Sequence, residues 1–175
     1  MDKYSAEDMK VLASITSKDL TLTNTLSEYF KKNNIHKDIL SQSCTLERLV
    51  EIFDKMISKH LDNHATEINC LEVASILGTI INAYDLSKLT DKELDLVINA
   101  LSFGVKNGLV KEDKPDYSIV SFLHPIIKDL LYKKLENKQK HHLRYNILLK
   151  QKYPTRHLII AENLYRGHIA LIKVL

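Results

Sequence analysis

Apolar and polar residues follow the 3.6-residue period of a helix along most of the chain. In residues 1–62 this period predicts three helices, the first beginning after Ser5 and the second carrying Leu22 and Leu26. The third follows Thr45 and places six apolar side chains on one side: Leu46, Leu49, Val50, Phe53, Met56 and Ile57. These helices are amphipathic, so each is expected to bury one face.

The next segment, Ala65 to Ile81, is apolar on nearly every side. Such a pattern is typical of a helix in the centre of a core, and we predict one buried helix over this range. Thr90 and Glu93 have the spacing of a capping box, which predicts a further helix over Asp91–Lys106. Gly108 is expected just after its end, at the C′ position.

The period then changes to that of strands. Leu109–Lys111 and Tyr117–Phe122 are expected to form a β-hairpin, with a turn that contains Pro115. Pro125 is expected at the first position of a helix that runs to about Leu135. Two more helices are predicted over 138–152 and about 158–175.

Helices followed by one hairpin and another helix give the order of a winged helix. We therefore predict a mainly α fold with three parts. Residues 1–62 are an N-terminal helical segment, 63–135 a winged-helix domain whose hairpin is the wing, and 136–175 the start of a helical arm.

Several stretches resemble STAND-type signalling NTPases, most of all the branch fused to class III (soluble-type) adenylate cyclases. Leu71–Gly78 resembles the first winged-helix helix of that family, and Leu94–Leu109 its third. Phe122–Tyr132 matches the family pattern Phe-x-His-x-x-Ile-x-Asp/Glu-x-x-Tyr, and Ala161–Ala170 resembles the beginning of its TPR-like arm. The resemblance implies a lid-like role for residues 1–62 and a regulatory, non-catalytic role for the whole.

In that family the histidine of this pattern is identified as a contact of the β-phosphate of ADP, which makes His124 a candidate cofactor-binding residue. The chain has no Gly-x-x-x-x-Gly-Lys-Ser/Thr loop to cradle phosphates. We therefore expect no cofactor in the isolated chain, and ADP or ATP only where a partner supplies an NTPase domain, in cis or in trans. The alternative is that His124 caps its own helix or fills a gap beneath the wing.

Charge is unevenly distributed. From Lys128 to Arg156 there are nine Lys or Arg against two acidic residues, while the whole chain has a net charge of only +3. This band is a possible interaction surface, although a solvated helix face has the same pattern. Its candidate residues are Lys133, Lys134, Lys138, Lys140 and Arg144.

A winged helix also suggests nucleic-acid binding, which is the alternative function. However, the expected third helix opens with Asp91, Glu93 and Asp95, and carboxylates repel phosphates. This charge favours a protein partner, such as an NTPase or cyclase domain, over nucleic acid. We expect a cytoplasmic location with no membrane association, because no apolar stretch is long enough to span a bilayer.

Candidate chemistry is sparse, and we predict neither a catalytic residue nor a metal site. His60 and His64 share a helix face but lack a third ligand, so we expect them at a helix edge. His141 and His142 lie in the basic band, where we expect solvated side chains. Cys70 falls in the most apolar helix, where a thiol is normally inert packing.

Overall fold

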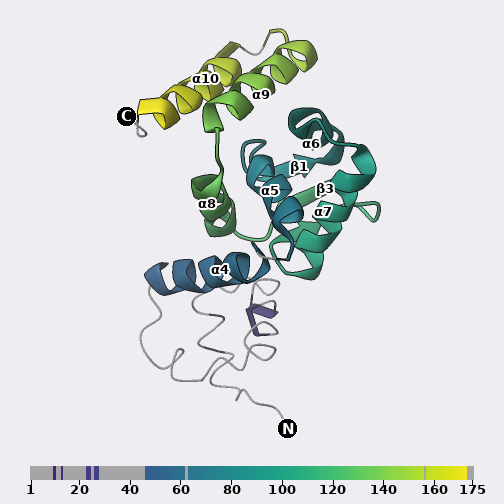
Figure 1. Ribbon diagram of the computed structural model, residues 1–175, viewed down its shortest axis with the longest axis vertical. Coiled ribbons are helices and arrows are strands. Elements are labelled where there is room, and N and C mark those ends of the chain that lie inside the picture. The colour runs from purple at the N-terminus through teal and green to yellow at the C-terminus, as the bar shows by residue number, and fades with distance from the viewer. Residues whose placement is uncertain are drawn as a thin grey trace. The chain divides into compact units, whose positions relative to one another are not determined.

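The computed structural model of the chain describes residues 46–61, 63–155 and 157–172, together with residues 10, 13, 23, 24, 26 and 27 (Figure 1). Within these residues the fold is mainly helical with one small sheet, as predicted. The chain divides into two compact units, Met1–Met56 and Ile57–Leu175, and the division falls within α4 (Leu46–Leu61). The domain boundaries predicted at 62/63 and 135/136 stay predictions. No helix in the described part of the chain is both long and apolar enough to cross a membrane.

In the first unit, α4 has the predicted amphipathic pattern. Ile52, Phe53 and Met56 are buried on one side of it, and the neighbouring Glu51 and Lys55 are exposed. Most of each of the helices expected after Ser5 and around Leu26 lies outside the described residues. Residues 10, 13, 23, 24, 26 and 27 are helical.

The second unit is built around α5 (Ala65–Ala74), which contacts α6 (Ala83–Thr90), α7 (Leu94–Lys106) and α8 (Pro125–Lys134). Because neighbours surround it, α5 is apolar on almost every side, which confirms the predicted central, buried helix. Its buried apolar side chains are Ile68, Cys70, Leu71, Val73 and Ala74.

The predicted extension of this helix to Ile81 is wrong. After Ala74 the chain makes a turn, and Gly78 adopts a φ of +114°, which a residue with a Cβ rarely adopts. The chain then continues as strand β1 (Ile80–Asn82). The two adjacent isoleucines that looked like a helix end suit a strand equally well, since β-branched side chains favour one.

The predicted capping box at Thr90 and Glu93 is also wrong, because α6 lies directly before it. Thr90 Oγ1 donates a hydrogen bond to the Leu86 carbonyl at 2.8 Å, within the last turn of α6. Helix α7 begins at Leu94 after Glu93, whose side chain makes no capping bond. The end of α7 is as predicted, with Gly108 at a φ of +68° directly after the C-cap.

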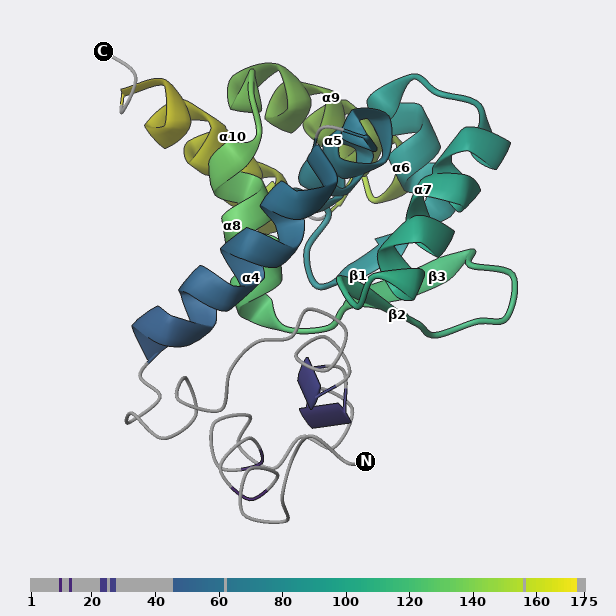
Figure 2. The ribbon, with the colours of Figure 1, turned by 60° about the horizontal axis from the view of Figure 1, so that its bottom comes forward.

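The sheet has three antiparallel strands in the order β1-β3-β2, where β2 spans Val110–Glu112 and β3 spans Ile119–Phe122. Ile81 pairs with Val120, and Lys111 pairs with Ser121. The hairpin expected between residues 109 and 122 is therefore confirmed, and β1 adds a third strand that was not predicted. Figure 2 shows the strands side by side, with α6 and α7 gathered next to them.

The last two helices, α9 (Lys138–Lys152) and α10 (His157–Ile172), have the bounds that the pattern predicts to within a few residues. They lie side by side and run in opposite directions (Figure 1). Helix α9 also contacts α6, so the hairpin of α9 and α10 is joined to the sheet-containing part of the unit through α9.

Candidate functional site: the contact between the sheet and helix α9

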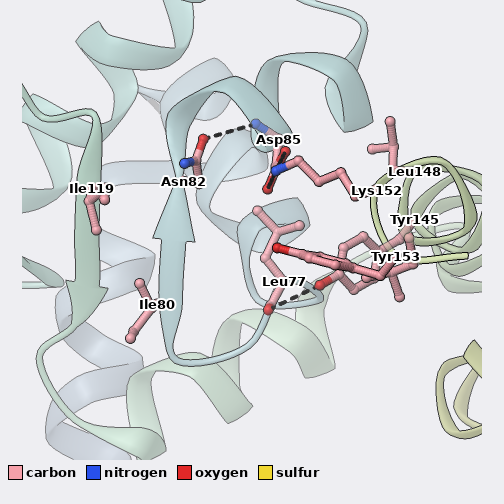
Figure 3. A pocket seen from close by; sticks show the side chains of 10 residues that line it. Leu77, Ile80, Asn82, Asp85, Ile119, Tyr145, Leu148, Lys152 and Tyr153 are labelled. Carbon is pink, nitrogen blue, oxygen red and sulfur yellow. Dashed lines mark hydrogen bonds and ion pairs between the residues drawn. The ribbon is translucent and has the colours of Figure 1, made fainter. Parts of the chain in front are cut away.

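An ion pair fastens the last turn of α9 to the first turn of α6. Lys152 Nζ lies 2.6 Å from Oδ1 and 2.7 Å from Oδ2 of Asp85 (Figure 3). Asn82 accepts hydrogen bonds from the backbone N–H groups of Tyr84 and Asp85 and so caps α6, which places the Asp85 carboxylate at the positive end of the helix. The Lys152 side chain is 44% exposed, so this pair contributes only about 0.2–1 kcal/mol.

Tyr145 adds a second contact between α9 and the turn before β1. Its hydroxyl lies 3.5 Å from the carbonyl oxygen of Leu77 (Figure 3). Burial raises the pKa of Tyr145, and the nearby Asp85 and Tyr153 raise it further. The phenol therefore keeps its proton at neutral pH and acts as a donor toward Leu77.

These residues surround a hollow of about 200 Å³. Its walls come from the outer side of the sheet and from the end of α9: Leu77, Ile80, Asn82, Asp85, Ile119, Tyr145, Leu148, Leu149, Lys152 and Tyr153. Pockets for small molecules usually measure about 300–1,000 Å³. The hollow is smaller than that, and the polar groups of Asp85, Lys152 and Tyr145 in its walls already contact groups of this chain.

A buried polar cluster ties α8, α9 and α10 together. His142 is only 3% exposed, so the expected solvated side chain is wrong for this residue. Its Nδ1 lies 2.6 Å from Asn163 Oδ1, and its Nε2 lies 2.9 Å from the hydroxyl of Tyr132. The Asn163 oxygen only accepts, so Nδ1 carries the proton and Nε2 accepts from the phenol. Burial is the main cause that lowers the pKa of His142, which favours this neutral form.

The same cluster fixes the orientation of two side-chain amides. Asn163 Nδ2 donates to the backbone carbonyl of His142 at 3.2 Å and to Asn146 Oδ1 at 3.0 Å. Turning either amide would bring two N–H groups together, so neither can turn. Asn146 is 2% exposed, and within the described part of the chain its Nδ2 has no acceptor. Among the described residues it is thus a buried donor without a hydrogen-bond partner.

His124 lies where the sequence places it, at the start of α8. Its Nδ1 accepts a hydrogen bond from the backbone N–H of Ile126 at 3.2 Å, and Pro125 occupies the first helical position. His124 therefore caps its own helix, as one of the alternatives for this residue predicts. Because Nδ1 accepts, the neutral ring carries its proton on Nε2. Its predicted role toward ADP stays a prediction.

Two residues of the predicted basic surface stabilise helix ends of this chain. Lys138 Nζ donates to the carbonyls of Lys133 and Leu135 at 3.1 and 2.5 Å, at the C-terminus of α8. Arg144 Nη1 lies 3.5 Å from the Leu89 carbonyl, near the end of α6. Cations at helix C-termini offset the negative end of the helix dipole, which accounts for these positions.

The other three residues of that surface differ in their contacts and exposure. Lys134 Nζ lies 3.5 Å from Ser58 Oγ, whereas Lys133 and Lys140 are exposed. The predicted interaction surface itself stays a prediction. Sequence position alone could not reveal the contact of Arg144, because the Leu89 carbonyl lies 55 residues earlier in the chain.

Of the remaining candidate residues, His64 and Cys70 lie in places that packing explains. The ring of His64 lies 4.6 Å from that of Phe103, centroid to centroid, and the side chain of His60 lies outside the described residues. Cys70 is buried, and burial raises the pKa of its thiol to about 11, which suppresses the reactive thiolate. No group of three or more His, Cys, Asp or Glu side chains in the described ranges is placed to hold a metal ion.

Comparison with known proteins adds no relationship to this geometry. No protein-family model, no curated protein and no solved structure matches the chain.

Proposed function

We propose that the chain is a non-catalytic, cytoplasmic regulatory module that acts through protein–protein contacts, like the middle region of a STAND NTPase–adenylate cyclase protein. In this proposal residues 63–135 are a winged-helix domain, and residues 136–175 begin a TPR-like arm. The order helix, strand, helix, helix, strand, strand supports the first part, as does β3 lying between β1 and β2. The antiparallel α9 and α10 support the second.

The negative charge at the beginning of α7 favours a protein partner over nucleic acid. In nucleic-acid-binding winged helices this third helix enters the major groove. Here Asp91, Glu93 and Asp95 are exposed at its beginning, where they would face phosphates. Of the basic residues in α9, Lys138 and Lys152 are already engaged within the chain.

One observation carries the proposal: the hairpin of α9 and α10 leaves large apolar side chains in solvent. Leu143, Ile147, Leu164 and Tyr165 are all exposed. Leu143 and Leu164 line one groove, and exposed apolar side chains that gather in this way mark interaction sites in many proteins. The hairpin therefore supplies a surface that a protein partner would cover.

The proposal is tested by cross-linking the tagged, full chain in its native cells, followed by mass spectrometry and a parallel assay for bound nucleic acid. We expect reproducible cross-links to one protein, unaffected by nuclease treatment. Nucleic acid that copurifies, is removed by nuclease and dissociates steeply with salt would instead support the alternative of a winged-helix nucleic-acid-binding protein.

A nucleotide enters this proposal only with a partner. An NTPase domain that carries its own phosphate-binding loop would bring ADP to His124, whose place at the N-terminus of α8 suits an anionic group. Without such a partner the proposal predicts no nucleotide binding, since His124 is a single donor and phosphate sites gather several.

A further inference from the structure

We propose that the groove between α9 and α10 binds an amphipathic helix of a partner protein whose apolar face is flanked by acidic side chains. This inference rests on the proposed function and names the kind of partner. The groove has a volume of about 620 Å³ and is lined by Gln139, Lys140, His142, Leu143, Asn146, Leu164 and Gly167. It shares no lining residue with the hollow between the sheet and α9.

Both sides of the groove present apolar side chains. Leu143 on α9 is 56% exposed, and Leu164 on α10 is 45% exposed. Ile147 follows Leu143 by one turn of α9 and is also exposed. A helix seated along the groove would insert an apolar row between Leu143 and Leu164, which is the usual way in which an amphipathic helix is recognised.

The positive charge of α9 determines which kind of partner helix the groove favours. Helix α9 has no acidic residue, and its exposed stripe Lys140, Leu143, Ile147 and Lys150 has the 3-4-3 spacing of one helix face. Leu143 and Ile147 thus lie between two lysines along this face. On α10, Arg166 is already paired with Glu162. Acidic side chains beside the partner's apolar row would meet Lys140 in the groove, with Lys150 further along the same face of α9, whereas basic side chains would be repelled.

The floor of the groove contains a further, independent feature. Asn146 lines it, and its Nδ2 is the buried donor for which the described residues provide no acceptor. An unsatisfied buried donor costs about 1–3 kcal/mol. This nitrogen is itself buried, so the choice of occupant rests on the apolar and charged side chains of the groove and not on this donor.

An anionic membrane surface is the other occupant that a basic, apolar helix face suggests. The shape argues against it, because the apolar side chains border a groove between two helices and do not form one broad face. Membrane binding is therefore an outcome of the test and not the proposal.

The test uses the full chain and two synthetic helical peptides of about 15 residues, long enough for a helix to form on binding. Both carry the same leucine face, one with Glu and one with Lys at the flanking positions, and binding is followed by fluorescence anisotropy. We expect the Glu peptide to bind at least about tenfold more tightly than the Lys peptide, and less tightly as salt increases.

Variants locate the site. Leu143→Glu should weaken binding of the Glu peptide by about tenfold or more, and Lys140→Glu should narrow the preference between the peptides. Leu96→Glu is the matched control, since Leu96 is equally exposed but lies on α7. It should leave binding unchanged. All three positions are exposed, so circular dichroism is expected to show unchanged folding.

The proposal is overturned if both peptides bind equally, if Leu143→Glu keeps full binding, or if Leu96→Glu weakens it as much. Binding to phosphatidylserine vesicles without binding of either peptide would also overturn it, in favour of a membrane surface. The cross-linking experiment distinguishes a failure of the docking groove from a failure of the proposed function. Protein cross-links that survive Leu143→Glu would leave the interaction role standing and place the contact elsewhere.

Discussion

His142 and Asn163 bind each other reciprocally: the ring Nδ1–H of His142 donates to Asn163 Oδ1 at 2.6 Å, and Asn163 Nδ2 donates to the backbone carbonyl of His142 at 3.2 Å. The residues lie 21 positions apart, one on α9 and one on α10. Because both are buried, a shift of one helix along the other would break both bonds and leave polar groups unpaired. This pair therefore fixes the register of the hairpin that forms the proposed docking groove.

Replacing Asn163 by Leu should destabilise the fold by roughly 1–3 kcal/mol. The substitution conserves size but leaves His142 Nδ1 and Asn146 Oδ1 without their partner. The change would appear as a lower urea midpoint with an unchanged m-value. Glu162→Gln, which weakens an exposed pair on the same helix, is the control and should change stability by less than about 0.5 kcal/mol. Equal effects of the two variants would contradict a structural role for the cluster.

Stability should decline as the pH falls below about 6.5, the ordinary pKa of histidine. Burial lowers the pKa of His142 in the folded state, so the unfolded chain takes up a proton first and gains stability relative to the fold. Burial also lowers the pKa of His141, which adds to the same trend, whereas burial raises the pKa of Glu72 and acts in the opposite direction in more acidic solution.

Urea titrations at pH 8, 7, 6 and 5, as rough steps across the histidine range, would measure this trend. His142→Gln should reduce the pH dependence, because glutamine keeps a polar side chain that does not titrate. An unchanged pH dependence of stability in His142→Gln would contradict a lowered pKa of His142 in the folded state.

Gly167→Ala should destabilise the chain although alanine is the better helix former. The helix preference favours alanine by about 1 kcal/mol. A Cβ at residue 167 would, however, lie 2.9 Å from the Cβ of His142, an atom that no side-chain rotation moves. Overpacking of this kind costs about 1–3 kcal/mol, so we expect a net loss of roughly 1 kcal/mol. Thermal unfolding would reveal it, and a raised melting temperature would mean that α9 and α10 are further apart.

The 3.6-residue period of apolar side chains predicted most of the described helices, because each of these helices packs its apolar face against neighbouring elements. Lys138–Lys152 was predicted to the residue, since Pro154 and the polar residues before Lys138 bound it. The segment up to Ile81 failed for a physical reason. A run that is apolar on all sides is compatible with a buried helix and with a buried strand, and the turn at Gly78 depends on packing that lies outside that local sequence.

The candidate site was harder to predict, because its groups come together from distant positions. The charge of Lys152 is visible in the sequence, but its partner Asp85 lies 67 residues earlier. Charge alone likewise suggested solvated histidines, whereas His142 is buried by Asn163 and Tyr132 from other helices. The His124 cap was foreseeable, since the proline that follows marks the start of a helix.

His124→Ala should lower stability by about 0.5–2 kcal/mol, because it removes the acceptor for the N–H of Ile126 at the start of α8. His124→Asn should restore most of this loss, since asparagine is a strong N-cap. Urea unfolding of the isolated chain measures both changes. Equal stability of the three proteins would mean that the cap contributes nothing.

The same two variants separate the cap from the predicted ADP contact. In a complex with an NTPase partner, His124→Asn keeps α8 capped but lacks an imidazole to reach the β-phosphate. If His124 contacts ADP, calorimetric titration should show weaker ADP binding for both variants, by about 1.5–3 kcal/mol for one charge-assisted bond. If His124 only caps α8, His124→Asn should bind ADP as the wild type does.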